Sequence, residues 1–186
     1  YGGNMGMPQD IPFFVSCLKR FRGRSDCFFV ICGAGCSYGR FEQSMKESGQ
    51  ANLLLIPGLT RNEYDTLLEG CDIGLIFLDS RFTVPNFPSR LLSYLEKSIP
   101  VLCCTDCSTD VGIVCEQNGF GWRCMSDSTD GFATLADKIC GLTDEEIARM
   151  GEKGRQYLEL HYTASDCCRK IAEDYATQKP KGAVIG

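Results

Sequence analysis

Arg90 occupies a position in this 186-residue chain that calls for a chemical explanation. It follows Pro88 and Ser89 and stands at the first turn of a predicted helix, where the helix dipole disfavours a cation by roughly a few tenths of a kcal/mol. An anion held between the side chain and the helix end would offset this cost. The sequence therefore predicts a phosphate site at Arg90, with a solvated surface arginine as the alternative.

Several loops carry other residue types that bind phosphate or sugar hydroxyls. Each follows a predicted strand or, for the first, opens the chain: GGNMGMPQ, GAGCSYG, PGLTRNE, DSRFTVPNFPSR and TDCSTD. Two of them are glycine-rich, and three carry Arg, Asn, Ser or Thr. Glycine amides can approach a phosphate closely, although Gly3 and Gly6 could equally form only a tight turn.

Apolar runs and helical patterns alternate along the chain and predict the elements that position these loops. The fold class is α/β, with a doubly wound parallel sheet, and residues 1–177 form one domain followed by a tail, 178–186, that is disordered or of vector origin. Capping boxes begin helices at Thr60 and Thr143. The predicted strands are 27–32, 52–58, 72–78, 100–104 and 119–124, and the predicted helices are 11–21, 40–49, 60–70, 88–97, 108–119, 130–142, 143–160 and 164–176.

Composition limits the partners and the compartment. The net charge of −5 argues against a nucleic-acid partner, and no apolar run is long enough to span a membrane. The chain carries 13 cysteines without the spacing of a disulfide framework, which predicts reduced thiols in a cytoplasmic protein. The single CxxC motif, Cys104 to Cys107, lacks a second correctly spaced pair, so we expect no metal site.

A family resemblance emerges from the order of five segments: YGGNMG, FFVICGAG, NLLLIPGLTRNEYDTLLEGCDIGLIFL, FPSRLLSYLEKSIPVL and GFGW. Together they resemble the C-terminal, donor-binding domain of family 4 (group 1) glycosyltransferases of the GT-B fold, bacterial surface-polysaccharide type, over residues 1–175. The resemblance implies a glycosyltransferase whose donor is a nucleotide-diphosphate sugar, with a UDP-sugar favoured, and which needs no metal or other cofactor. It implies a cell-envelope or capsular saccharide, or a lipid-linked acceptor, held by an N-terminal domain.

The resemblance also implies where such a protein works and what this chain is. We expect a fragment that lacks the acceptor domain and is inactive alone. The full-length protein would be cytoplasmic, with at most peripheral association at the inner face of the cytoplasmic membrane.

Roles carry over from the family to matching positions. The first loop would contact the distal phosphate and the sugar, residues 57–59 the base, and residues 89–91 the diphosphate, with Tyr64 or Leu68 closing the base pocket. Arg90 is the candidate catalytic residue, because negative charge grows on the leaving diphosphate. The candidate donor-binding residues are Gly3, Asn4, Gly6, Gln9, Gly33, Gly35, Pro57, Gly58, Leu59, Arg61, Tyr64, Pro88, Ser89, Leu91 and Ser93.

The sequence departs from the family pattern in its charged residues. Two glutamates that many members carry correspond to Pro85 and Ser93, and the usual Arg and Lys of the first loop correspond to Asn4 and Gln9. Arg90, helped by Arg61, would then carry more of the diphosphate charge. Glu96 and Glu116 remain as nearby carboxylates.

Three alternatives stay open. Gly33, Gly35 and Gly39 follow a strand as in a dinucleotide-binding oxidoreductase, but the next strand ends in Pro57 and Gly58 where an acidic residue would hold the ribose. The missing charges also permit a non-catalytic nucleotide-sugar-binding module. A nucleotide-sugar epimerase of this architecture would need more acid and base groups than the chain shows.

Overall fold

The structure, a computed structural model, describes residues 1–81, 83–84 and 86–178. Within these residues strands and helices alternate, which confirms the predicted α/β class. The strands are β1 (Gly2–Asn4), β2 (Phe29–Ala34), β3 (Leu53–Pro57), β4 (Gly74–Phe77), β5 (Val101–Thr105) and β6 (Gly121–Met125). The helices are the 3-10 helix η1 (Met7–Gln9), then α1 (Ile11–Lys19), α2 (Tyr38–Ser48), α3 (Arg61–Leu68), α4 (Arg90–Glu96), α5 (Val111–Gln117), α6 (Thr129–Cys140), α7 (Asp144–His161) and α8 (Ala164–Gln178).

All strand pairs are parallel, and they form two three-stranded sheets. One sheet has the order β1-β2-β3 and the other β4-β5-β6. Tyr94 of α4 contacts both β1 and β4, which places these two strands next to each other. The strand order therefore reverses between the two sheets, as it does at the switch point of a doubly wound fold. The sequence analysis did not predict that the ladder is interrupted at this point.

Tyr94 of α4 bridges the two sheets. Its hydroxyl accepts a hydrogen bond from the Gly2 amide and donates one to the Leu75 carbonyl, both at 3.3 Å. The side chain is 1% exposed, and burial raises the pKa of its phenol well above the ordinary value. A buried hydroxyl with two backbone partners thus joins β1 to β4 where no strand ladder does.

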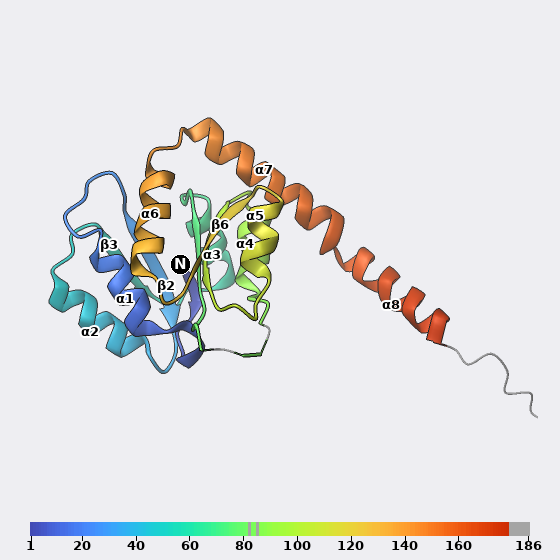
Figure 1. Cartoon of the computed structure of the whole chain (residues 1–186), viewed down its shortest axis with the longest axis horizontal. Coiled ribbons are helices and arrows are strands. Elements are labelled where there is room, and N and C mark those ends of the chain that lie inside the picture. The colour runs from blue at the N-terminus through green and yellow to red at the C-terminus, as the bar shows by residue number, and fades with distance from the viewer. Residues whose placement is uncertain (82, 85, 179–186) are drawn as a thin grey trace, which may run out of the picture.

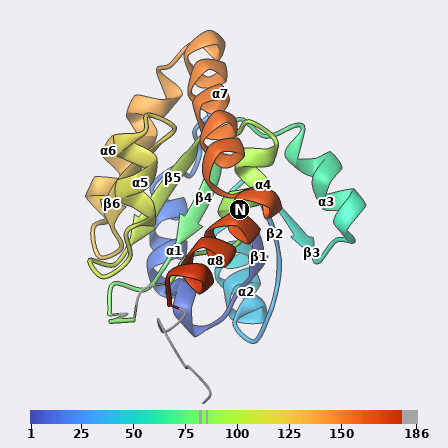
Figure 2. The same cartoon turned by 90° about the vertical axis from the view of Figure 1, so that its right-hand side faces the viewer.

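The core lies on both faces of the sheets, so the domain has three layers. Successive residues of β4 and β5 alternate between the two faces, as the pleat requires. One cluster gathers side chains from α1, α2 and α6, and the other gathers side chains from α3, α4, α5 and α7. Figures 1 and 2 show the helices covering both sides of the sheets.

Both predicted capping boxes are confirmed: Thr60 caps α3 with Glu63, and Thr143 caps α7 with Glu146.

The last two helices differ in their packing. Helix α7 packs against α4, whereas Figure 1 shows α8 projecting away from the sheets. It ends at Gln178, and the remaining residues of the predicted tail, 179–186, lie outside the described residues.

The bounds of β2 differ from the prediction for a physical reason. The apolar run at 27–32 predicts a strand, yet β2 spans Phe29–Ala34 and includes two residues assigned to the loop. Gly33 and Ala34 pair with Gly3 and Asn4 of β1, so strand pairing rather than hydrophobicity sets the end of β2. Helix α4 is also shorter than the predicted 88–97.

Candidate functional site

Arg90 lies at the carboxyl end of β1, beside the switch point. Its guanidinium stacks over the ring of Tyr1, with Cζ 4.2 Å from the ring centroid. Nη2 donates to the Asn4 carbonyl at 3.4 Å, while Nη1 is shielded from solvent and has no hydrogen-bond partner among the described residues. A Cβ atom added at Gly3, whose φ is +122°, would lie 3.5 Å from the Arg90 guanidinium. The structure therefore brings Arg90 together with Gly3 and Asn4, from which it is 86 or more residues away in sequence.

Gly33, near the end of β2, and Gly35, just after it, allow the first loop to approach. A Cβ at Gly33 would lie 2.7 Å from the Gly3 carbonyl oxygen, and one at Gly35, where φ is +134°, would lie 2.5 Å from Asn4 Oδ1 and from the Met5 carbonyl oxygen. Their first role is thus to let β1 and its loop pack against the end of β2. This explains the glycine spacing without a dinucleotide, and it counts against the oxidoreductase alternative.

Gln9 supports the first loop from inside. Its side chain is 6% exposed, and Oε1 accepts a hydrogen bond from the Gly6 amide at 2.8 Å. The loop is also tied to the end of β4, because the Asp79 amide donates to the Pro8 carbonyl at 2.9 Å. Gln9 therefore shapes the loop, and the Gly6 amide is occupied within the protein.

Residues 57–59 lie at the same edge of the sheet. Pro57 pairs with Gly33 in the register of β2 and β3, and Gly58 lies beside Ala34. Burial raises the pKa of the Cys32 thiol, and the Leu59 amide opposes this as a hydrogen-bond donor. The predicted base-contacting segment and the predicted phosphate loop are thus both at the carboxyl ends of neighbouring strands.

Tyr64 packs against β1. A Cβ at Gly2 would lie 2.2 Å from the Tyr64 hydroxyl oxygen, so only glycine leaves room for this ring. The hydroxyl lies beside Tyr94 and Arg90 but forms no hydrogen bond with the described residues. Burial raises its pKa, with the neighbouring Tyr94 hydroxyl and the Arg90 charge acting in the opposite direction. Leu68, the other candidate for closing a base pocket, is 4% exposed in the core.

The turn before α4 positions the remaining candidates. Pro88 is buried and its carbonyl accepts from the Leu91 amide at 3.0 Å, while the Leu91 side chain is fully buried. Ser89 is exposed, and its side chain does not cap the helix. Ser93 is half-buried, one turn after Arg90. Pro85, the position of the other missing glutamate, lies outside the described residues.

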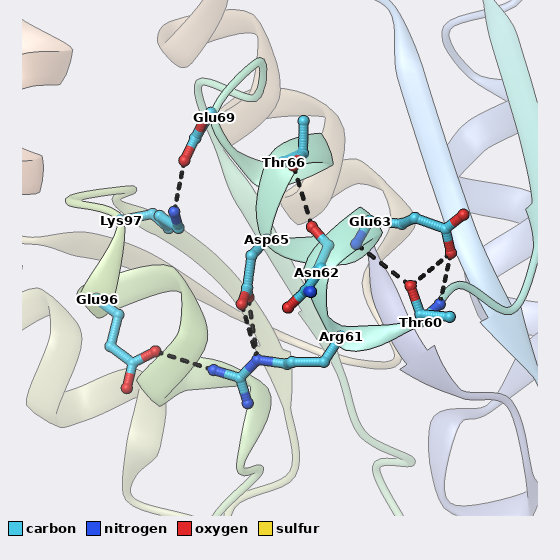
Figure 3. A network of polar contacts seen from close by, with 9 residues as sticks. All are labelled: Thr60, Arg61, Asn62, Glu63, Asp65, Thr66, Glu69, Glu96 and Lys97. Carbon is cyan, nitrogen blue, oxygen red and sulfur yellow. Dashed lines mark hydrogen bonds and ion pairs between the residues drawn. The ribbon is translucent and has the colours of Figure 1, made fainter.

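Arg61 forms ion pairs with two carboxylates. Its Nε is 3.0 Å from Asp65 Oδ2 and its Nη2 is 3.2 Å from Glu96 Oε2, as Figure 3 shows. That Arg61 helps Arg90 to bind a diphosphate stays a prediction, and in this structure its side chain is paired with these two carboxylates. The two remaining carboxylates of the prediction are paired as well, since Glu96 pairs with Arg61 and Glu116 pairs with Arg123 at 3.2 Å.

Sequence reasoning missed Tyr1 and Tyr94, and it gave the loop after β5 only as one of five candidate loops, without the contacts of its residues. In that loop the buried Asp106 accepts from the Ser108 amide at 2.7 Å and from the Thr109 hydroxyl at 2.9 Å. The Asn86 amide in turn donates to the Thr109 hydroxyl at 3.4 Å, which ties the β5 loop to the segment before α4. An Asp followed by Ser or Thr after a strand is the local signal that could have indicated these hydrogen bonds within the loop.

The described residues contain neither a cluster of metal ligands nor a helix that could span a membrane. No group of three or more His, Cys, Asp or Glu side chains is arranged to hold a metal ion. None of the helices in the described part of the chain is both long and apolar enough to cross a membrane.

Comparison with known proteins decides the fold. No known protein family's sequence profile matches the chain. A probable glycosyltransferase of Pseudomonas aeruginosa, WbjE, is 24% identical over 170 residues, which cover 91% of this chain and 42% of that protein. The crystal structure of the C-terminal domain of a group 1 glycosyl transferase, LpcC of Francisella tularensis, superposes with a TM-score of 0.66 at 15% identity, covering 88% of this chain and 87% of that one.

The chain has the fold of a glycosyltransferase C-terminal domain. The predicted resemblance is confirmed at this level. Anabaena HepE, solved in complex with UDP, gives a TM-score of 0.73 at 12% identity, with coverage of 95% of this chain and 48% of that one. This C-terminal-type domain thus spans less than half the length of WbjE and HepE, whereas the separately crystallised LpcC domain has a similar extent.

Proposed function

We propose that this chain is the donor-binding domain of a glycosyltransferase and that it binds the diphosphate of a nucleotide sugar at Arg90. The observation that carries the proposal is the convergence of Arg90, Gly3 and Asn4 at the switch point, where doubly wound sheets bind their ligands. The Arg90 guanidinium retains donor capacity, because its one hydrogen bond to the described residues, from Nη2 to the Asn4 carbonyl, is 3.4 Å long and Nη1 has no partner among them.

The chemistry follows from the charge that develops in sugar transfer. As the glycosidic bond to the diphosphate breaks, negative charge grows on the leaving phosphate oxygens. A guanidinium already held in place stabilises that charge without reorganising, and its planar fork matches two phosphate oxygens. Arg90 would thus stabilise the leaving group, the first loop would position the distal phosphate through groups other than the Gly6 amide, which Gln9 occupies, and residues 57–59 would contact the base.

A UDP-sugar is the favoured donor. The fold neighbour HepE was solved with UDP and, separately, with UDP-glucose, and TarM of Staphylococcus aureus was solved with UDP. The proposal further includes a cell-envelope or capsular saccharide acceptor, bound by a second domain, and transfer without a metal ion. A cytoplasmic place of action rests on the thiol-rich composition alone.

A non-catalytic nucleotide-sugar-binding module is the second candidate. Ser93 offers no carboxylate near Arg90, and the carboxylates of Glu96 and Glu116 are both paired with arginines. Such a module would bind the donor but would not support transfer even when joined to an acceptor domain. Transfer by the full-length protein separates the two candidates.

Calorimetric titration tests the binding site directly. The chain is titrated with UDP, GDP, ADP and NAD, and then with UMP, GMP and AMP. We expect one nucleoside diphosphate to bind and its monophosphate to bind far more weakly, because the second phosphate supplies the contact with Arg90. Binding of NAD alone would contradict the proposal.

Arg90→Ala and Arg61→Ala form the matched pair of variants. A charge-assisted hydrogen bond contributes about 1.5–3 kcal/mol, so Arg90→Ala should weaken diphosphate binding about 10- to 100-fold. Arg61→Ala removes the same charge from an exposed ion-pair network and should leave the affinity unchanged. Equal affinities in the two variants would refute the role of Arg90 in diphosphate binding.

A further inference from the structure

Two cysteines face each other across β5 and β6. Cys104 and Cys124 are direct partners in the parallel register, and their sulfur atoms are 3.4 Å apart. Neighbouring strands lie about 4.8 Å apart, within the range of about 4.4–6.8 Å that a disulfide requires between Cα atoms. The sulfurs would need to approach by little more than about 1.3 Å to reach the bonded distance of about 2.05 Å.

The two thiols differ in their access to solvent. Cys104 is fully buried, whereas Cys124 is partly exposed on β6, the last strand of its sheet. Burial, followed by the hydrogen bond with Cys124, raises the pKa of Cys104 well above its ordinary value. The same hydrogen bond lowers the pKa of Cys124 and outweighs the effect of its burial. Cys124, the more exposed residue of the pair, is thus also the one whose sulfur more readily becomes a thiolate.

A second thiol pair in the same domain provides a contrast. Cys103 of β5 and Cys115 of α5 also face each other, with their sulfurs 4.0 Å apart. Both side chains are fully buried, and the pKa of Cys103 is raised well above its ordinary value, first by the hydrogen bond with Cys115 and then by burial. An oxidant cannot reach either sulfur without opening the core.

We propose that Cys104 and Cys124 are an oxidation site, at which a hydroperoxide converts the two thiols into a reversible disulfide. This site is separate from the proposed donor site and does not depend on it. Thiol-rich proteins of reducing compartments form such bonds transiently, which agrees with the reduced cysteines that the composition predicts.

The reaction proceeds in two balanced steps. The Cys124 thiolate attacks one oxygen of hydrogen peroxide, so that an S–O bond forms, the O–O bond breaks and hydroxide leaves, which gives a sulfenic acid. The Cys104 sulfur then attacks the Cys124 sulfur, so that the S–S bond forms and the S–O bond breaks. The departing hydroxide and the Cys104 proton leave as water, and the two thiols have supplied two electrons to the peroxide.

The test is a mapping of disulfides after mild oxidation of the 186-residue chain. The protein is treated with hydrogen peroxide, the remaining thiols are alkylated, and the chain is cut with trypsin. Residues 98–123 and 124–138 form separate tryptic peptides, and the second contains Cys124 as its single cysteine. We expect these two peptides to be joined in the native protein and released by dithiothreitol.

Two variants and one measurement identify the partner in the larger peptide. The cross-link should disappear in Cys104→Ser and persist in Cys103→Ser, its matched neighbour. Fragmentation of the wild-type cross-linked peptide distinguishes Cys103 from Cys104 even where a variant does not fold. Attachment of Cys124 to Cys17 would instead join the peptide of residues 1–19, because Cys17 also lies near this pair.

Three results would overturn the proposal. The first is no cross-link at Cys124 when exposed thiols such as Cys36 and Cys107 are oxidised. The second is a cross-link from Cys124 to any cysteine other than Cys104. The third is an equal yield of the Cys104–Cys124 bond in protein unfolded in urea, since the fold would then play no part in selecting the pair.

Discussion

Removal of the Tyr94 hydroxyl tests how the two sheets are held together. Tyr94→Phe keeps the buried ring but leaves the Gly2 amide and the Leu75 carbonyl without this partner. An unsatisfied buried backbone group costs about 1–3 kcal/mol. Both hydrogen bonds are 3.3 Å long, at the weak end of the normal range, so we take the lower limit for each. The expected loss in the free energy of unfolding is about 2 kcal/mol.

Tyr64→Phe is the matched control. It removes an equivalent buried hydroxyl from a neighbouring ring, but this hydroxyl forms no hydrogen bond with the described residues. The expected change in the free energy of unfolding is within about 0.5 kcal/mol. The comparison therefore separates the effect of the bridge from the effect of altering a buried tyrosine in this part of the core.

Urea unfolding followed by the fluorescence of Trp122 measures both variants. This single tryptophan is 7% exposed in β6 and should report loss of the second sheet. We expect a lower midpoint for Tyr94→Phe at an unchanged slope, and a fall in melting temperature of roughly 4–8 °C for a chain of this size. Equal midpoints for the two variants would refute the bridge. If only Tyr64→Phe lowered the midpoint, the bridging hydrogen bonds would belong to Tyr64 and not to Tyr94.

Three further substitutions test other parts of the structure. Gly35→Ala places a Cβ 2.5 Å from two oxygen atoms at a residue with positive φ, so it should lower the free energy of unfolding by about 2 kcal/mol or more. Its control is Gly39→Ala, whose Cβ meets no atom within 4 Å and which should cause no such loss. Denaturant titration measures both variants. Thr143→Ala removes the cap of α7 and should cost about 1 kcal/mol in the same assay, and an unchanged midpoint would contradict the capping box. The pKa of Asp79 is lowered by its hydrogen bond with Arg81, so its contribution to stability is present above the unfolded pKa and is lost as the pH falls. Unfolding measured below about pH 4 should therefore show a smaller further loss of stability in Asp79→Asn than in the wild type, and parallel pH profiles would exclude this contribution.

Local sequence signals predicted most of the fold. The capping boxes at Thr60 and Thr143 need only residues three positions apart, and the alternation of apolar runs with helical patterns needs only a short window. The predicted elements are therefore present in the structure, with boundaries that are shifted by about two residues. The place of Arg90 in the first turn of α4 was predicted for the same reason.

Long-range contacts could not be predicted in this way. The pairing of Gly33 with Gly3 extends β2 beyond its apolar run, and the Tyr94 bridge joins segments 92 residues apart. The partners of Arg61 were also hidden, since Glu96 lies 35 residues away on another helix. In each case the controlling interaction depends on the packing of elements, which a pattern read along one segment does not contain.

The position of Arg90 is explained by the protein itself before any ligand is considered. The helix dipole costs roughly a few tenths of a kcal/mol, whereas a guanidinium over an aromatic ring gains about 0.5–1 kcal/mol or more when partly desolvated. The Tyr1 ring therefore offsets the dipole and fixes the cation at the end of β1. A cation that the fold holds in place loses little entropy when a phosphate binds. The stacking of Arg90 on Tyr1 is therefore compatible with a role in binding, because it holds the guanidinium in the position where an anion would bind.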